Sequence, residues 1–467
     1  MKNEKGPLQV NGFIALTGED IMKNRLPKAI ESISRRAWNN QMIIVPGCEI
    51  MRNTRQLDFE KSNAYMICCG TTETVNHNST ILHGKIYHPT EKEVQESLSE
   101  SLIEGKIMNV TNNLSQIDGN YTIAAVNNDR IICARDPLGT KPLYISKNKS
   151  FTGVSTEAKA LSILGCEKIE RIPPGYLYHI TPSKIQVTRF RNVKRRFSKI
   201  NENEAPKKIL SFLEESIKRR VMGLKKIAIG FSGGLDSSLL AHIASRFVEV
   251  NLVSIYSPGS RDEVIPCEAA NRLNLNIEMV KVEYEDVAIM IPELIHILET
   301  DAKMDLSTGL GIYLASQKAQ ELGMEGIMLG QLADELFGGY AKYIRNMIHG
   351  EKYVNEMLLN DVLKGYKNNF ERDEKAVSSF TIPILPYAAI DLVEYGLSIP
   401  LHLKIDSQNQ IRKKVLREAA IISGLPKKLA LEPKKALQYS TGLHKLIIKG
   451  LKQTQITNPY IVSDYQI

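Results

Sequence analysis

The sequence has few cysteines, a single tryptophan and no long apolar segment. Six of its 467 residues are cysteine, and they form neither a CxxC pair nor a spacing typical of a metal site. Scattered cysteines in a chain of this length favour reduced thiols over a disulfide framework, so we expect a cytoplasmic protein. The first ten residues lack the apolar core of a signal peptide, and no run approaches the ~20 apolar residues of a membrane span. We therefore expect no membrane partner.

Neither sign of charge dominates the chain. It carries 60 Lys and Arg against 52 Asp and Glu, a net charge of +8, and 43% of its residues are hydrophobic. This composition is typical of a globular protein, and the length predicts two or three domains. One dense basic run, residues 194–196, is interpreted as a solvated face or a linker, because it is too small to favour a nucleic acid as a partner.

A glycine- and serine-rich loop is the strongest local signal. Residues 226–231 are a short apolar run with β-branched members, which predicts a buried strand, and an apolar helical pattern begins at residue 239. Seven residues join the two: Ser232, Gly233, Gly234, Leu235, Asp236, Ser237 and Ser238. Glycines let backbone N–H groups close around an anion, while the serine hydroxyls and the helix N-terminus add further donors. The loop therefore predicts a phosphate site.

The loop differs from a Walker A loop, because it lacks the lysine of G-x-x-x-x-G-K-[ST]. It carries Asp236 instead, and a carboxylate beside phosphate makes sense mainly through Mg²⁺. The string SGGLDSS resembles the PP-loop of ATP pyrophosphatases, which cut ATP between the α- and β-phosphates. The resemblance implies ATP and Mg²⁺ as cofactors, with Asp236 as a metal ligand. A lone Ser-Gly-Gly would favour an ordinary turn, but the whole string after a strand favours the phosphate site.

Short strands separated by turn signals dominate the first 190 residues. Helical patterns lie at residues 26–37 and 93–104. The expected strands are residues 12–16, 42–45, 64–69, 122–126, 130–134 and 177–180. This arrangement predicts an αββα-like sandwich.

Four segments of this half resemble the asparagine synthetase family, in its class II glutamine amidotransferase domain. They are 83–88 (HGKIYH), 134–144 (ARDPLGTKPLY), 155–161 (STEAKAL) and 172–175 (IPPG). With the loop SGGLDSS, the resemblance covers nearly the whole chain in the right order.

The resemblance implies three regions. Residues 1–190 would be an amidotransferase-like domain, residues 191–205 a charged linker, and residues 206–467 a PP-loop synthetase domain. We therefore expect an α/β protein with two domains.

The amidotransferase-like domain lacks the family's nucleophile. A class II glutaminase uses an N-terminal cysteine, whose thiol attacks glutamine and whose α-amine is the base. Here NGFIA at residues 11–15 resembles the family's CGxxA start, which puts Asn11 in the nucleophile's place, and His83 stands at the family's oxyanion Asn. We expect an inactive glutaminase, with Cys48 and Cys68 as buried cysteines rather than substitute nucleophiles.

Strands and helices alternate from residue 206 onward, which predicts a doubly wound parallel sheet with ligands at the carboxyl ends of its strands. Ser257 opens a turn that resembles the family's SxxxDE turn near the nucleotide. The segment 329–340, LGQLADELFGGY, resembles the family's SGEGADExFGGY. The resemblance implies that Gly330 lies at the nucleotide and that Asp334 shares Mg²⁺ and pyrophosphate with the loop aspartate. A helical part follows, and the helix expected at residues 411–423 opens with a basic cluster.

Two further positions bear on the chemistry. Gln331 falls where asparagine synthetases carry Glu and β-lactam synthetases carry Tyr. Glutamine cannot accept a proton at neutral pH, so either the amine arrives neutral, another group is the base, or the chemistry differs. The resemblance also implies a lysine after Pro433 that stabilises charge on the α-phosphate; Lys434 aligns best, with Lys435 as its rival.

These observations predict an ATP-dependent amide-forming ligase. It would adenylate a carboxylate, by default aspartate, and transfer an amine to give asparagine. Because the glutaminase site is degenerate, the ammonia would be free or supplied by a partner glutaminase. The alternatives are a β-lactam-synthetase-like or other amidoligase acting on a different acid and amine, and an ATP-binding regulator without turnover. A homodimer is expected from the family alone.

Overall fold

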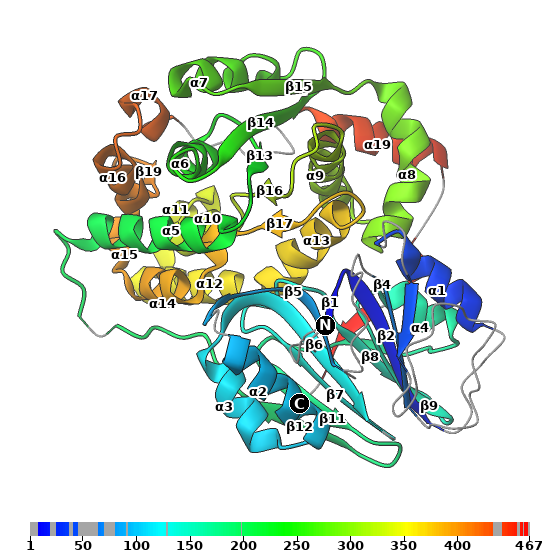
Figure 1. The fold of residues 1–467 in the computed structure, drawn as a ribbon. Helices are drawn as coiled ribbons and strands as arrows, with labels where there is room; N and C mark the ends of the chain where they lie inside the picture. The colour runs from blue at the N-terminus through cyan, green and yellow to red at the C-terminus, as the bar shows by residue number, and fades with distance from the viewer. Residues whose placement is uncertain are drawn as a thin grey trace. The chain divides into compact units, whose positions relative to one another are not determined.

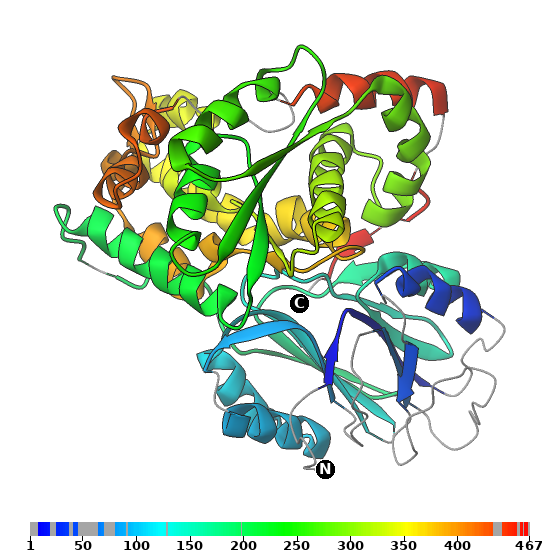
Figure 2. The ribbon, with the colours of Figure 1, turned by 45° about the horizontal axis from the view of Figure 1, so that its top comes forward.

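The computed structural model describes residues 8–18, 25–36, 41–44, 64–69, 80–89, 92–127, 129–197, 199–432, 441–454, 458–460 and 462–465. The chain divides into two compact units (Figures 1 and 2). Unit 1 comprises Met1–Asn192 and Pro459–Ile467, and unit 2 comprises Val193–Asn458.

Unit 1 contains two sheets. In the part of the chain that the structure describes, the first sheet has the strand order β1 (Leu8–Val10), β5 (Thr80–His88), β6 (Asp118–Asn127), β7 (Arg130–Arg135), β11 (Tyr176–Ile180) and β12 (Ile185–Arg189). The second has the order β20 (Val462–Asp464), β10 (Ile169–Arg171), β8 (Tyr144–Lys147), β9 (Phe151–Ser155), β2 (Gly12–Gly18), β4 (Ala64–Cys69) and β3 (Gln41–Ile44).

Alternation along β2 explains how the layers of unit 1 are built, because successive side chains of a strand point to opposite faces. Phe13 and Ala15 pack into one core with residues of the first sheet. Ile14 and Leu16 belong to a different core on the other face. That core includes α1 (Leu26–Ser34) and α4 (Ala158–Ile163), while α2 (Lys92–Glu104) and α3 (Ile107–Gln116) pack on the first sheet. The αββα sandwich is confirmed.

The sheet of unit 2 consists of parallel strands. Their order is β15 (Ile277–Lys281), β14 (Glu249–Tyr256), β13 (Lys226–Gly230), β16 (Ile327–Met328) and β17 (Pro383–Ile384). The chain runs outward from β13 through β14 to β15, then returns to β16 on the other side of β13. The connections leaving β13 and β16 therefore diverge, and such a switch point opens a crevice for ligands at the carboxyl ends of the strands.

Helices cover and extend this sheet, as Figure 1 shows. They are α5 (Ala205–Val221), α6 (Leu235–Ala244), α7 (Ile265–Leu273), α8 (Tyr284–Leu298), α9 (Lys303–Glu321), α10 (Ala333–Phe337), α11 (Ala341–Arg345), α12 (Glu351–Leu363), α13 (Glu371–Val377), α14 (Ile390–Ser398), α15 (Leu401–Lys404), α16 (Lys414–Ile422), α17 (Lys427–Ala430) and α19 (Leu443–Thr454). A doubly wound parallel sheet with a helical C-terminal part is thus confirmed. None of the described helices is long and apolar enough to cross a bilayer.

Two details differ from the sequence expectations. The helix expected at residues 411–423 begins only at Lys414, because Ile411–Arg412 forms the short strand β19, which pairs with β18 (Ile405–Asp406). The last residues, expected with the synthetase domain, lie in unit 1, because β20 pairs in parallel with β10.

Candidate functional site

The loop after β13 forms one wall of the site. Gly234 is the N-cap of α6, and among the described residues no side chain caps this helix, so its first N–H groups can face an anion. Ser237 Oγ donates to the carbonyl of Gly234 at 3.3 Å and lies 3.5 Å from Ser232 Oγ. Gly233 has φ +69°, a conformation that favours glycine, which explains its place in the turn. The loop thus offers backbone and hydroxyl donors at the carboxyl end of the central strand.

The loop after β16 lies against this wall. A Cβ added at Gly330 would lie 3.3 Å from the Cβ of Asp236, so the two loops are in van der Waals contact at the switch point. Leu332 turns the chain with φ +79° and is the N-cap of α10, which carries Asp334 in its first turn. The two aspartates that the sequence analysis singled out therefore lie in the first turns of two helices, α6 and α10, that follow these neighbouring loops.

Asp236 and Asp334 converge on a lysine that the sequence analysis did not assign. The Nζ of Lys413 lies 2.5 Å from Asp236 Oδ2 and 2.6 Å from Asp334 Oδ1. The Lys413 side chain is 1% exposed, against 12% for Asp236 and 16% for Asp334. A Cβ added at Gly339 would lie 2.2 Å from Lys413 Cε, so the glycine gives this lysine its room. The basic cluster at the start of α16 was the sole sequence signal for Lys413.

The two carboxylates fit a divalent cation carried by phosphates. One oxygen of each carboxylate already contacts the same cation, the Lys413 ammonium, so the two carboxylates can bind one cation together. Mg²⁺ is commonly held by one or two carboxylates together with substrate phosphates rather than by an all-protein cage. No cluster of three or more His, Cys, Asp or Glu able to hold a metal occurs in the described ranges.

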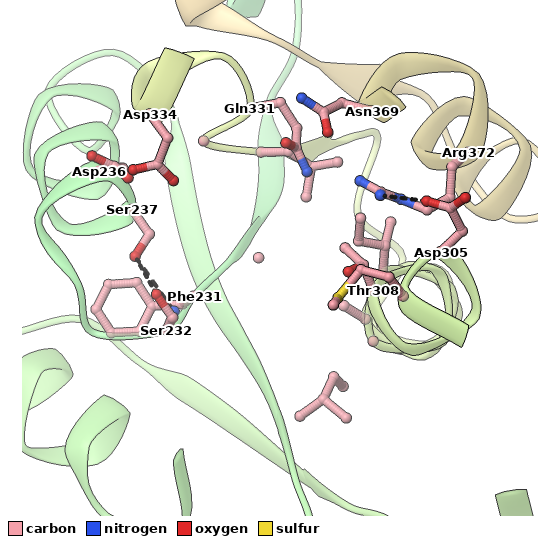
Figure 3. Close-up of a pocket in the computed structure, with 18 of the residues that line it drawn as sticks. Phe231, Ser232, Asp236, Ser237, Asp305, Thr308, Gln331, Asp334, Asn369 and Arg372 are labelled. Atoms are coloured by element: carbon pink, nitrogen blue, oxygen red, sulfur yellow. Dashed lines mark hydrogen bonds and ion pairs between the residues drawn. The ribbon is translucent and has the colours of Figure 1, made fainter. Parts of the chain in front are cut away.

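A cavity of about 320 Å³ opens between the loops and α9 (Figure 3). One part of its wall is apolar and is supplied by the strand ends and α9: Phe231, Val253, Ile255, Ile312 and Leu329. The polar residues of the wall are Ser232, Asp236, Ser237, Asp305, Thr308, Gln331, Asp334, Tyr340, Asn368, Asn369 and Arg372. An apolar patch faced by converging polar groups is typical of a small-molecule site.

Gln331 lies at the cavity, beside a buried polar network. Tyr340 Oη donates to Glu335 Oε1 at 2.6 Å, and Asn369 Nδ2 donates to the same oxygen at 2.7 Å. Burial, followed by the charge of Asp334, raises the pKa of Glu335. The network fixes the Tyr340 hydroxyl and the Asn369 amide at the cavity wall.

An ion-pair chain lies across the cavity from the phosphate loop. Arg372 pairs with the buried Asp373 at 2.7 Å and with Asp305 at 3.3 Å. Burial raises the pKa of Asp373 to about 6, although the Arg372 charge opposes this shift. Figure 3 shows Asp305 and Arg372 on one side of the cavity and Asp236 and Ser237 on the other.

Some of the remaining predicted residues line the cavity and others do not. Of the loop, only Ser232, Asp236 and Ser237 line the cavity; Gly233, Gly234, Leu235 and Ser238 do not. Ser257 is also outside the lining, and its hydroxyl donates to the carbonyl of Thr441 at 3.0 Å. Lys434 and Lys435 lie outside the described residues, as does Cys48.

In unit 1, Asn11 and His83 lie close together. Asn11 joins β1 to β2, and β1 pairs with β5 so that Val10 is opposite His83. Asn11 Nδ2 donates to the carbonyl of Arg36 at 3.0 Å, and Arg36 Nη1 donates back to the carbonyl of Asn11 at 3.2 Å. A Cβ added at Gly12 would lie 2.6 Å from Arg36 Cδ. A buried arginine therefore fills the space beside Asn11 and Gly12.

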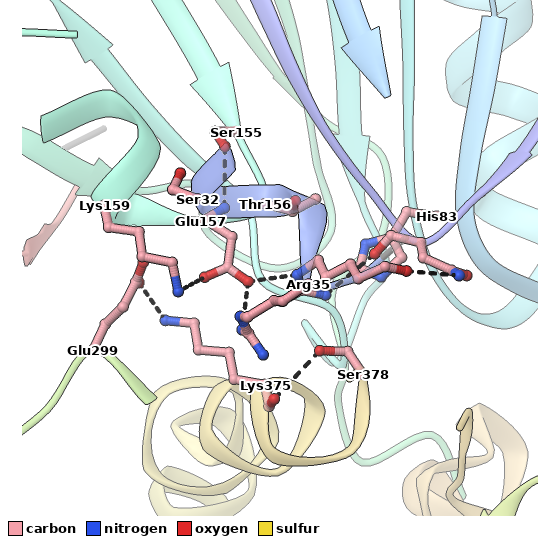
Figure 4. A network of polar contacts seen from close by, with 12 residues as sticks. Ser32, Arg35, His83, Ser155, Thr156, Glu157, Lys159, Glu299, Lys375 and Ser378 are labelled. Carbon is pink, nitrogen blue, oxygen red and sulfur yellow. Dashed lines mark hydrogen bonds and ion pairs between the residues drawn. The ribbon is translucent and has the colours of Figure 1, made fainter. Parts of the chain in front are cut away.

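Arg36 is held there by a buried ion-pair network centred on Glu157. Figure 4 shows Glu157 between Arg35 and Lys159. Arg36 pairs with Glu157, which also pairs with Arg35 at 2.7 Å and Lys159 at 3.1 Å. The side chains of Arg36, Glu157 and Lys159 have no exposed surface. Cys68 is fully buried in the core between the sheets, as expected.

Comparisons with known proteins agree with this architecture. A family model described as "Asparagine synthase" matches residues 208–350 and 343–455, and one described as "Glutamine amidotransferase domain" matches residues 66–163. A putative glutamine-hydrolysing asparagine synthetase of Methanocaldococcus jannaschii is 32% identical over 394 residues, covering 73% of this chain and 72% of the relative.

Two further relatives are more distant. A probable glutamine-hydrolysing asparagine synthetase of Schizosaccharomyces pombe is 26% identical over 379 residues, covering 73% of this chain and 66% of its own length. Asparagine synthetase B of Escherichia coli is 24% identical over 374 residues, covering 76% of this chain and 66% of its own length.

Proposed function

This chain belongs to the asparagine synthetase family, and we propose that it is an ATP-dependent ligase that forms an amide from a carboxylate and an amine. One observation carries the proposal. Asp236 and Asp334 meet at one cationic group beside a cavity of about 320 Å³, at the switch point of a parallel sheet. That arrangement suits a nucleotide with its phosphates at the loop and a second substrate across the cavity.

In the first step, the substrate carboxylate attacks the α-phosphorus of ATP. An oxygen–phosphorus bond forms, the bond between the α- and β-phosphates breaks, and pyrophosphate leaves. Ser232, Ser237 and the N–H groups of α6 bind the phosphates, and Lys413 neutralises developing charge beside the two carboxylates. Asp236 and Asp334 would hold Mg²⁺, which when bound neutralises phosphate charge. Lys434, or Lys435, is proposed to stabilise the charge on the α-phosphate.

In the second step, the amine attacks the carbonyl of the acyl-adenylate and AMP leaves, with the surplus proton passing to solvent. Gln331 lies at the cavity and can orient the amine or the acyl oxygen through its amide, but it cannot take the proton. This favours an amine that arrives neutral. The adenylate is needed because carboxylate oxygen is a poor leaving group, whereas AMP is a good one.

The amine is proposed to come from a source other than glutamine bound in unit 1. Asn11 has neither a thiol nor a free α-amine, and the buried Arg36 fills the adjoining space. Free ammonia is the simplest donor, and a partner glutaminase is the alternative. Aspartate is the proposed acid, in line with the names of the relatives.

Pyrophosphate release from ATP and Mg²⁺ tests the proposal. We expect release with aspartate and ammonium, none with aspartate and glutamine, and loss of release in Asp236→Ala but not in Asp391→Ala, an exposed aspartate of α14. Turnover with glutamine would contradict an inactive unit 1. Release with another acid would replace aspartate while keeping the mechanism. ATP binding without release for any acid would instead support a regulator.

A further inference from the structure

The cavity wall contains one opposite-charge pair that the steps above leave unused. Its charged residues are Asp236, Asp305, Asp334 and Arg372, so Arg372 is the single cation among the described residues that line it. Asp236 and Asp334 already share the Lys413 ammonium. Asp305 and Arg372 therefore remain as one negative and one positive group facing the same space.

Contacts with Asp373 and Asn368 hold Arg372 in place, and the Asp373 carboxylate already neutralises the charge of the guanidinium. Its Nε donates to Asp373 Oδ1 at 2.8 Å, and its Nη1 donates to the carbonyl of Asn368 at 3.2 Å. Asp373 is 2% exposed and Arg372 is 9% exposed, so this pair is well shielded from water. Nε and Nη2 both face Asp373, so the guanidinium can offer a substrate carboxylate its Nη1–Nη2 end, where its contact with Asp305 is long, at 3.3 Å.

Asp305 is bound more loosely. It lies in the first turn of α9, its side chain is 35% exposed, and its contact with Arg372 Nη1 is long, at 3.3 Å. In the part of the chain that the structure describes, no group donates to its second oxygen. A carboxylate oxygen at the cavity is thus available to a cationic group.

We propose that Asp305 and Arg372 recognise the α-ammonium and the α-carboxylate of an amino acid whose second carboxylate points to the phosphate loop and is adenylated. This inference rests on the proposed function and assigns the residues that select its acid. An α-amino acid carries adjacent charges of opposite sign, and the adjacent Asp305 and Arg372 complement both. A simple dicarboxylate offers Asp305 no cationic group, and the one ion pair of Asp305 is its long contact with Arg372, so a dicarboxylate is disfavoured.

ATP–pyrophosphate exchange tests this inference, because it reports adenylation without the amine. The probes are L-aspartate, succinate, which lacks the α-ammonium, and β-alanine, which lacks the α-carboxylate. We expect the wild type to prefer aspartate to either analogue by about tenfold or more in kcat/KM, since each analogue lacks one of the two charged groups that Asp305 and Arg372 would bind. If glutamate is the better acid, glutarate and 4-aminobutyrate replace the two analogues.

Each variant should lose only the contact that it makes. Asp305→Asn is expected to lower kcat/KM for aspartate about tenfold and to leave succinate unchanged. Arg372→Lys should lower kcat/KM for aspartate and leave β-alanine unchanged. Glu321→Gln is the matched control, because it changes a carboxylate to an amide on the same helix at an exposed pair with Lys318, and we expect no effect.

Other outcomes overturn the inference in distinguishable ways. Equal losses for all three acids would show that the pair only ties α9 to α13. Wild-type exchange with succinate as efficient as with aspartate would refute the inference and leave the proposed adenylation intact. No exchange with any acid would refute the proposed adenylation and this inference with it. Thermal melting of each variant confirms that it is folded.

Discussion

Replacement of Lys413 by methionine tests the charge arrangement at the centre of the site. The variant keeps most of the apolar stem but removes an ammonium that lies 2.5 Å from Asp236 and 2.6 Å from Asp334. Two nearly buried carboxylates then face each other. Removing one partner of a buried ion pair costs about 3 to 5 kcal/mol, and because the aspartates keep some contact with water we expect about 3 kcal/mol. This corresponds to a melting temperature lower by about 6 to 12 °C.

Mg²⁺ should partly reverse this loss, because a divalent cation can take the place of the missing charge. We expect added Mg²⁺ to raise the melting temperature of Lys413→Met by more than it raises that of the wild type. Melting followed by circular dichroism, with and without Mg²⁺, measures both effects. Lys414→Met is the control, because it makes the same change one residue along the chain. Equal stability of Lys413→Met and wild type, or an equal effect of Mg²⁺ on both, would refute the reasoning.

Three more predictions follow from single contacts. Burial and the nearby Arg195 lower the pKa of Lys404 to about 7; the unfolded chain therefore binds this proton more tightly, and stability rises between about pH 7 and pH 10. Lys404→Met should melt higher than wild type at pH 6, with the gain nearly gone at pH 10. Gly339→Ala should abolish pyrophosphate release, because its Cβ would lie 1.9 Å from Asp334 Oδ1. Asn11→Cys should not produce glutamate from glutamine, because position 11 has no free α-amine.

These three predictions fail under clear conditions. A pH-independent gain for Lys404→Met would show that its charge is not the cause. Wild-type turnover by Gly339→Ala would show that Asp334 can move without loss. Glutamate formation by Asn11→Cys would show that the thiol alone is sufficient in unit 1.

The sequence predicted what is encoded locally. The strand, loop and helix around Asp236 occupy a continuous stretch, and the short strands separated by turn signals in the first 190 residues made the sandwich predictable. Lys413 was not assigned, because it lies 177 residues from Asp236 and only the tertiary fold brings them together. In the sequence, a buried lysine and a solvated one look alike. The same holds for Asp305 and Arg372, which are 67 residues apart.

The pairing of β20 with β10 has a consequence for how the protein is made. The second sheet of unit 1 takes an edge strand from residues 462–464, after the whole of unit 2 in the sequence. During synthesis this sheet therefore stays incomplete until residues 462–464 leave the ribosome, and β10 keeps an open edge meanwhile. Open edges template contacts with other chains. In a fragment of residues 1–192, the edge of β10 would stay open permanently. Such a fragment should therefore associate or precipitate unless strand β20 is supplied as a peptide or fused to it.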